Sequence, residues 1–187
     1  MHNNGVGELV ALVDAATDLA DVADTVETIK SELCRLIRQG RIELPPAFIV
    51  PVEDRYARRL LHRDAERGYS IVVMTWGPCQ ATPIHDHAGM WCVEGVWGGS
   101  INVQQYDLVE QRGERFRFSR QNSYEAGVGS AGCLIPPYEY HSISNTCDSA
   151  PAVSLHIYGG DMVSCNVFTD AGDDWYRREL RSLGFDN

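Results

Sequence analysis

Residues 85–92 read His-Asp-His-Ala-Gly-Met-Trp-Cys, and a third histidine, His141, follows about fifty residues later in Tyr-Glu-Tyr-His-Ser-Ile-Ser-Asn. Strand side chains alternate with a period of two, so a strand would point His85 and His87 to the same side. Neutral imidazole is the commonest metal ligand in proteins. We therefore predict a metal site made of His85, His87 and His141.

The bulk composition is that of an ordinary globular protein. The chain has 187 residues, of which 44% are hydrophobic and 22% charged, which suits one domain with a sizeable core. A net charge of −10 and a pI near 4.9 argue against partners such as nucleic acid or an anionic membrane.

The sequence shows no membrane span and no secretory signal. No apolar run approaches the roughly 18 residues of a membrane span, and the first residues, Met-His-Asn-Asn, do not resemble a secretory signal. The six cysteines contain no CxxC pair. We therefore expect a cytoplasmic protein with reduced thiols.

The order of patterns along the chain predicts helices followed by strands. Apolar residues recur at helical spacing over 9–20 and 26–37, and Gly40 and Pro45-Pro46 end that pattern. Short strand-like runs follow at 69–76, 90–97, 101–107, 114–118, 131–135, 141–145, 152–158 and 163–168. We expect a mainly β fold in one domain, 1–187: a helical cap over 1–45 and an antiparallel, jelly-roll-like β-barrel over 55–170.

Two motifs of the cupin superfamily match in part. The first motif carries His-x-His, then a glutamate and a glycine; His85, His87 and Gly99 fit, but Cys92 stands in the glutamate position. In the second motif, Pro136, His141 and Asn145 keep the expected spacing, with Tyr138 in place of a glycine.

Loss of the motif glutamate changes the expected chemistry. Three neutral histidines would leave a divalent metal its full charge and several open positions, which favours an anionic, chelating substrate. A thiolate fits, because metal coordination lowers the pKa of a thiol. Ligands of this kind admit Fe(II).

Over residues 55–168 the chain resembles the thiol dioxygenases, and the cysteine dioxygenase family most closely. Those cupins bind Fe(II) through three histidines and convert a thiol into a sulfinic acid with O2. The matching segments are Tyr56-Ala57-Arg58, Trp76-Gly77, His85-Asp86-His87, Cys92, His141 and Ser154-Leu155-His156-Ile157-Tyr158.

The resemblance implies a role for each matching residue. Arg58 would bind the substrate carboxylate, with Tyr56 and Trp76 also at the substrate. The catalytic group would comprise Tyr158, His156, Ser154 and Cys92. Cys92 could form a thioether with Tyr158, whose hydroxyl would lie near the iron and be oriented by His156 and Ser154. Strand alternation places Ser154, His156 and Tyr158 on one face.

The leading functional hypothesis is an Fe(II)-dependent dioxygenase that takes L-cysteine and O2 to the sulfinic acid, with cysteine bound through its thiolate and amine. Some bacterial relatives carry a glycine in place of Cys92 and a glutamine in place of Arg58, and they prefer 3-mercaptopropionate; having both Arg58 and Cys92 favours an amino-acid thiol. Met90 and Trp91 differ from the usual pattern and would shape the pocket.

Several alternatives stay open. The substrate can be another thiol carboxylate, such as 3-mercaptopropionate or mercaptosuccinate, or the protein can be a cysteine-modifying cupin. A non-enzymatic metal-binding cupin fits the intact Ser-x-His-x-Tyr segment less well, and a metal-bound isomerase or storage cupin would normally retain the motif glutamate. The physiological thiol, the thioether, the pathway and the oligomeric state are not readable from the sequence.

Overall fold

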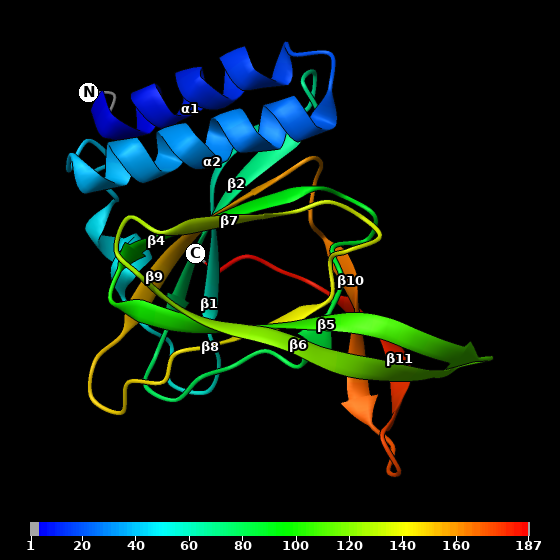
Figure 1. The fold of residues 1–187 in the computed structure, drawn as a ribbon. Helices are drawn as coiled ribbons and strands as arrows, with labels where there is room; N and C mark the ends of the chain where they lie inside the picture. Colours follow the sequence, from blue (N-terminus) through cyan, green and yellow to red (C-terminus); the bar gives the residue numbers. More distant parts are fainter. Residues whose placement is uncertain (1–3, 187) are drawn as a thin grey trace.

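A computed structural model describes residues 4–186, which form two α-helices, one 3-10 turn and eleven strands (Figure 1). The elements are α1 (Asn4–Thr17), α2 (Val22–Arg38), η1 (Pro46–Ile49), β1 (Ala57–Asp64), β2 (Tyr69–Trp76), β3 (Ile84–His85), β4 (Cys92–Gly98), β5 (Ser100–Arg112), β6 (Arg115–Gly127), β7 (Ala131–Leu134), β8 (His141–Ser144), β9 (Ala152–Tyr158), β10 (Ser164–Asp170) and β11 (Trp175–Ser182). No helix within this described range is long and apolar enough to cross a membrane.

The N-terminal helices begin and end where the sequence signals lie. Asp21 caps α2 by accepting hydrogen bonds from the backbone N–H groups of Ala23 and Asp24, which satisfies two otherwise unpaired donors. The helix ends at Arg38 with Gln39 as its C-cap, and Gly40 follows with a φ of +63°, a left-handed conformation that glycine adopts without a steric penalty. The expected helical cap is confirmed.

The strands form two sheets. The first has the order β1-β2-β9-β4-β7, and the other six strands close into a ring, β10-β11-β6-β5-β8-β3. Both helices lie across the first sheet, whereas the long β5–β6 hairpin extends away from them beside β11 (Figure 1). This is the mainly β, cupin-type fold that the sequence predicts.

The five-stranded sheet is buried on both faces, and strand alternation assigns a different role to each face. On the outer face, side chains such as Ile71, Val93 and Leu155 pack with the apolar residues of the helices. The inner face carries a second core that includes Trp76 and Tyr158. The helices thus cover one face, and the other face is available for a buried site.

Three strands do not appear among the expected runs: the two-residue β3 and the longer β1 and β11. β1 carries Arg58 and Arg59 among its apolar residues, and β11 is mostly exposed and rich in charge, so neither shows a clean alternation. β11 pairs with β10 and β6, so the closed ring continues beyond residue 170, the expected end of the barrel. β5 and β6 are also longer than expected, because their exposed outer halves lack an apolar face.

The contact between α2 and β4 requires a glycine. A Cβ at Gly95 would lie 2.6 Å from Leu33 Cδ2 and 3.3 Å from Ile37 Cδ1, in a fully packed core. We expect Gly95→Ala to lower the free energy of unfolding by about 1–3 kcal/mol through overpacking. Gly132→Ala on β7 is the control, because nothing lies within 4 Å of its added Cβ. Equal denaturant midpoints for the two variants would contradict this packing argument.

Candidate metal centre

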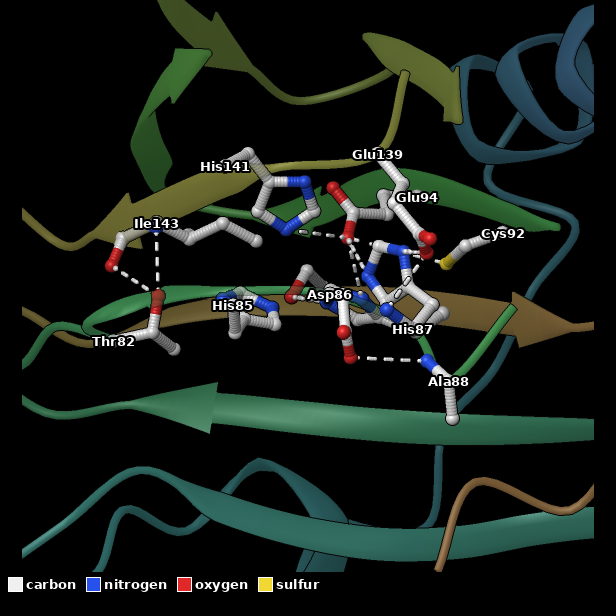
Figure 2. A network of polar contacts seen from close by, with 12 residues as sticks. Thr82, His85, Asp86, His87, Ala88, Cys92, Glu94, Glu139, His141 and Ile143 are labelled. Carbon is white, nitrogen blue, oxygen red and sulfur yellow. Dashed lines mark hydrogen bonds and ion pairs between the residues drawn. The ribbon is translucent and has the colours of Figure 1, made fainter. Parts of the chain in front are cut away.

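The three predicted histidines meet inside the barrel (Figure 2). His85 on β3 stands directly opposite His141 on β8, and His87 follows two residues after His85. The centroid of the His141 ring lies 4.5 Å from that of His85 and 4.9 Å from that of His87. One ring nitrogen from each residue falls within 4.8 Å of the other two, a spacing that one metal ion can bridge.

Polar contacts hold the turn that carries His87. The Asp86 carboxylate accepts hydrogen bonds from the backbone N–H groups of Ala88 and Asn166 and from the Asn166 side chain. Glu139 accepts the backbone N–H of His87 at 2.8 Å. His85 Nδ1 lies 3.1 Å from the carbonyl of Pro83, so a proton on Nδ1 would be donated there and Nε2 would keep its lone pair.

The imidazoles have the protonation state that a metal requires. Burial, together with the neighbouring His141, lowers the pKa of His85 to about 3. Burial and the adjacent histidines also lower the pKa of His87, and burial lowers that of His141. Both ring nitrogens of His87 and of His141 are buried without a hydrogen-bond partner. Because buried polar atoms are rarely left unpaired, these nitrogens fit a bound divalent metal ion.

A carboxylate that we did not predict faces the histidines. Glu94 Oε1 lies 3.4 Å from His141 Nε2 and 3.8 Å from His87 Nε2 (Figure 2). It also lies 3.2 Å from His156 Nδ1. Only 7% of Glu94 is exposed. The motif comparison predicts the three histidines but does not include this carboxylate. Glu94 lies two residues after Cys92 on β4 and shares its inward face, and a charge within an otherwise apolar strand was the signal available.

The Ser154–His156–Tyr158 line is present on the inner face of β9, but its contacts differ from the expected ones. Trp76 Nε1 donates to Ser154 Oγ at 2.9 Å, and Ser154 Oγ lies 2.8 Å from His156 Nε2. The other His156 nitrogen faces Glu94. Among residues 4–186 no hydrogen bond joins His156 to the Tyr158 hydroxyl, and the two rings lie 6.1 Å apart, centroid to centroid. His156 is thus oriented by Ser154 and Glu94.

Cys92 and Tyr158 are cross-strand partners. They stand directly opposite each other in the β4–β9 ladder, where Cβ atoms are typically about 4.5–5.5 Å apart. Both side chains are buried in the same core, and Cys92 Sγ lies 3.9 Å from Glu94 Oε1. Burial raises the pKa of the Cys92 thiol and of the Tyr158 phenol, so both are protonated at neutral pH.

Arg58 lines a small cavity that reaches His85. The wall of this cavity includes Tyr56, Arg58, Trp76, His85, His156, Tyr158 and Arg181. Tyr56 stacks on Trp76 with ring centroids 4.8 Å apart. Arg58 Nη1 and Nη2 donate to the carbonyls of Gly184 and Met162, each at 3.0 Å, which leaves further N–H donors of the guanidinium.

The other motif residues have structural contacts. The Asn145 side chain donates to the carbonyls of Trp76, Gly77 and Ala150, and so joins β2 to the segment after β8. Gly99 has a φ of +70°, and an added Cβ would lie 2.9 Å from the carbonyl oxygen of Pro151. Met90 and Trp91 pack against the glycine pair that follows β9, and neither lines the Arg58 cavity.

Comparison with known proteins identifies the family of this chain. Residues 46–171 match the sequence profile of the family "Cysteine dioxygenase type I". The chain belongs to that family. It is 24% identical over 119 residues to cysteine dioxygenase type 1 of Rattus norvegicus and 24% identical over 114 residues to that of Danio rerio; each match covers 61% of this chain and 56% of the relative. The chain thus spans about half the length of these curated relatives.

Solved structures also resemble the fold. One, an uncharacterized conserved protein with a double-stranded β-helix domain from Klebsiella pneumoniae, superposes with a TM-score of 0.48 at 15% identity, and the match covers 65% of this chain and 85% of that one.

The histidine triad predicts stoichiometric metal binding. We expect the purified protein to bind one equivalent of Fe(II) or Co(II), and His141→Ala to lose most of this affinity because it removes one of three nitrogen donors. Anaerobic titration followed by elemental analysis measures this. His62→Ala is the control, since His62 lies on β1 against Tyr69 and away from the triad. Full metal loading of His141→Ala would remove this residue from the ligand set.

Proposed function

We propose that this protein is an Fe(II)-dependent thiol dioxygenase whose substrate is L-cysteine, which it oxidises to the sulfinic acid. The overall reaction adds both atoms of O2 to the thiolate sulfur, R–S⁻ + O2 → R–SO2⁻, and needs no further reductant. Iron bound by His85, His87 and His141 would supply the binding of sulfur and dioxygen and the redox chemistry. Membership of the cysteine dioxygenase type I family supports this activity.

One observation carries the proposal: a single cavity is lined by both Arg58 and His85, one of the three histidines. Tyr158 and His156 line the same cavity. A short thiol carboxylate has matching ends, an anionic carboxylate and a metal-binding sulfur. The spare N–H donors of Arg58 suit the carboxylate, since a guanidinium can bind it bidentately.

The remaining residues would orient the substrate and keep water out. The stacked rings of Tyr56 and Trp76 give the cavity an apolar wall. Trp76 also fixes Ser154, which in turn contacts His156. The protonated Tyr158 hydroxyl would donate a hydrogen bond to the bound substrate or to oxygen.

Arg181 favours a second candidate substrate, mercaptosuccinate. This residue lines both the Arg58 cavity and the adjoining surface groove, and its side chain has no hydrogen-bond or ion-pair partner among residues 4–186. A thiol with two carboxylates could engage Arg58 with one and Arg181 with the other. The same dioxygenation would then produce the corresponding sulfinic acid.

The activity is tested by loading the protein with Fe(II) under anaerobic conditions and then admitting O2. We expect one O2 consumed per thiol and a product 32 mass units heavier than the substrate, as two added oxygen atoms require. The substrates are cysteine, 3-mercaptopropionate, cysteamine and mercaptosuccinate, and His141→Ala serves as the inactive control. Failure of all four thiols with a fully iron-loaded protein would refute the proposal.

Arg58 should determine the requirement for a carboxylate. We expect Arg58→Ala to raise KM for cysteine about tenfold or more, which corresponds to roughly 1.4 kcal/mol or more of lost binding. Cysteamine lacks the carboxylate, so its kinetics should change far less. Because Arg58 also contacts Gly184 and Met162, the unfolding midpoint of the variant is measured as a control. Equal losses for both thiols would exclude the carboxylate role.

The Cys92–Tyr158 pair should form a thioether during turnover. The cross-link joins sulfur to the ring carbon beside the hydroxyl and removes two hydrogens, with O2 as the oxidant. We expect a mass loss of about two units and two bands on a denaturing gel, in wild type only. Cys92→Ser should give one band and a partial loss of activity, whereas Tyr158→Phe should cost more because it also removes the hydroxyl. An unchanged mass after many turnovers would exclude the cross-link.

A further inference from the structure

Two cysteines outside the metal centre come together from distant parts of the chain. Cys79 lies in the turn that follows β2, and Cys147 lies in the segment between β8 and β9. The backbone N–H of Cys79 donates a hydrogen bond to the carbonyl of Cys147 at 3.2 Å. Neither residue lines the Arg58 cavity or belongs to the histidine triad. The pair is therefore separate from the site described above.

Hydrogen bonds fix the backbone on which each cysteine stands. The Asn145 side chain donates to the carbonyls of Trp76 and Gly77, and its backbone N–H donates to the carbonyl of Gln80 at 2.9 Å. The Asn145 Oδ1 atom in turn accepts the backbone N–H of Cys147 at 3.0 Å. The segment after β2 and the segment after β8 are thus held against each other by contacts on both sides of the cysteine pair.

The separation of the two backbones suits a disulfide. Standard bond lengths and the 3.2 Å hydrogen bond place the Cα atoms of Cys79 and Cys147 no more than about 7 Å apart. Residues that are hydrogen-bonded opposite each other in an antiparallel ladder have Cα atoms about 5.5 Å apart. Disulfides join cysteines whose Cα atoms are about 4.4–6.8 Å apart. Both residues are free thiols in this structure, so side-chain rotation alone would have to bring the sulfurs together.

Cys147 has the features of a reactive thiol. Hydrogen bonds from the backbone N–H and the hydroxyl of Ser149, and from the backbone N–H of Ala150, lower the pKa of Cys147 below its ordinary value. Its Sγ lies 3.6 Å from Ser149 Oγ. Burial instead raises the pKa of the Cys92 and Cys165 thiols. Because the thiolate is the nucleophilic form, Cys147 reacts with an oxidant more readily than those two residues.

We propose that Cys79 and Cys147 are a reversible redox pair, which a hydroperoxide oxidises to a disulfide. Cys79 is exposed and Cys147 partly exposed, so both are within reach of a small oxidant. The Cys147 thiolate attacks the O–O bond: R–S⁻ + R′OOH + H⁺ → R–SOH + R′OH. The Cys79 thiol then displaces water from the sulfenic acid and forms the S–S bond. The two thiols lose two electrons, the peroxide gains them, and a thiol reductant restores both cysteines.

The disulfide would join the segment before β3 to the segment before β9. Thr82 and Pro83, which follow Cys79 closely, line the Arg58 cavity and lead to His85. The cross-link also closes a long loop of chain between Cys79 and Cys147, which restricts the unfolded state and so stabilises the folded one. We therefore expect oxidation to raise the thermal stability of the protein.

The experiment treats the reduced chain, loaded with Zn(II) because zinc does not react with peroxide, with about one equivalent of hydrogen peroxide. We expect a mass loss of about two units, a Cys79–Cys147 cross-linked peptide, and recovery of the original mass with dithiothreitol. That recovery distinguishes the disulfide from the proposed Cys92–Tyr158 thioether, which a thiol reductant does not cleave. A cross-link between other cysteines, or none at all, would overturn the pairing.

Serine variants separate the two roles. Cys79→Ser should stop at the sulfenic acid of Cys147, seen as a gain of about 16 mass units and as labelling by dimedone. Cys147→Ser should label at Cys79 at least about tenfold more slowly, and Cys34→Ser, the matched control, should form the disulfide as wild type does. Equal rates of labelling in the first two variants would remove Cys147 from the role of nucleophile.

Thermal unfolding tests the structural consequence. Peroxide treatment should raise the Tm of wild type by about 5–15 °C, and dithiothreitol should reverse this shift. The Tm of Cys79→Ser and of Cys147→Ser should not rise on the same treatment. An equal rise in either variant, or no rise in a fully cross-linked wild type, would show that the disulfide does not stabilise the fold.

Discussion

The two-residue alternation of side chains across the five-stranded sheet determines both what stabilises this protein and what it can do. On one face, the sheet is apolar and packs against α1 and α2. On the other, β4 and β9 bring Cys92, Glu94, His156 and Tyr158 into the barrel, opposite the histidines of β3 and β8. A shift of register by one residue would exchange the faces, placing polar groups under the helices and emptying the site.

Desolvation sets the chemistry of that interior. Burial lowers the pKa of His85 and His87 and raises the pKa of the Cys92 thiol and of the Tyr158 phenol. The imidazoles, the thiol and the phenol are therefore all uncharged at neutral pH. Glu94 is the exception: burial acts to raise the pKa of its carboxyl, but His141 and His156 together hold that pKa below its ordinary value. A cavity of largely neutral donors with one carboxylate attracts a cation strongly, since little water competes for either partner.

The sequence predicts much of this arrangement, and the failures have physical reasons. Local signals of spacing and turn chemistry predict three features. These are the end of α2 just before Gly40, the histidine triad, and the shared face of Ser154, His156 and Tyr158. Glu94 was not predicted, because the motif position is occupied by Cys92 and the motif has no carboxylate two residues further along the strand. The contact of His156 with Glu94 was also unpredictable, because it depends on β4 being the neighbour of β9, whereas the Ser154 contact lies within β9 itself.

Residues 183–186, which follow β11, hold Arg58 in place. Arg58 is held by the carbonyl of Gly184 and by two hydrogen bonds between its backbone and Asp186, so a guanidinium at the barrel interior takes its position from residues almost at the other end of the chain. Substitutions among residues 183–186 would retune the placement of that guanidinium without disturbing the metal ligands or the helix-covered core. If Arg58 binds substrate as proposed, changes in residues 183–186 would alter substrate preference while the interior residues stay fixed.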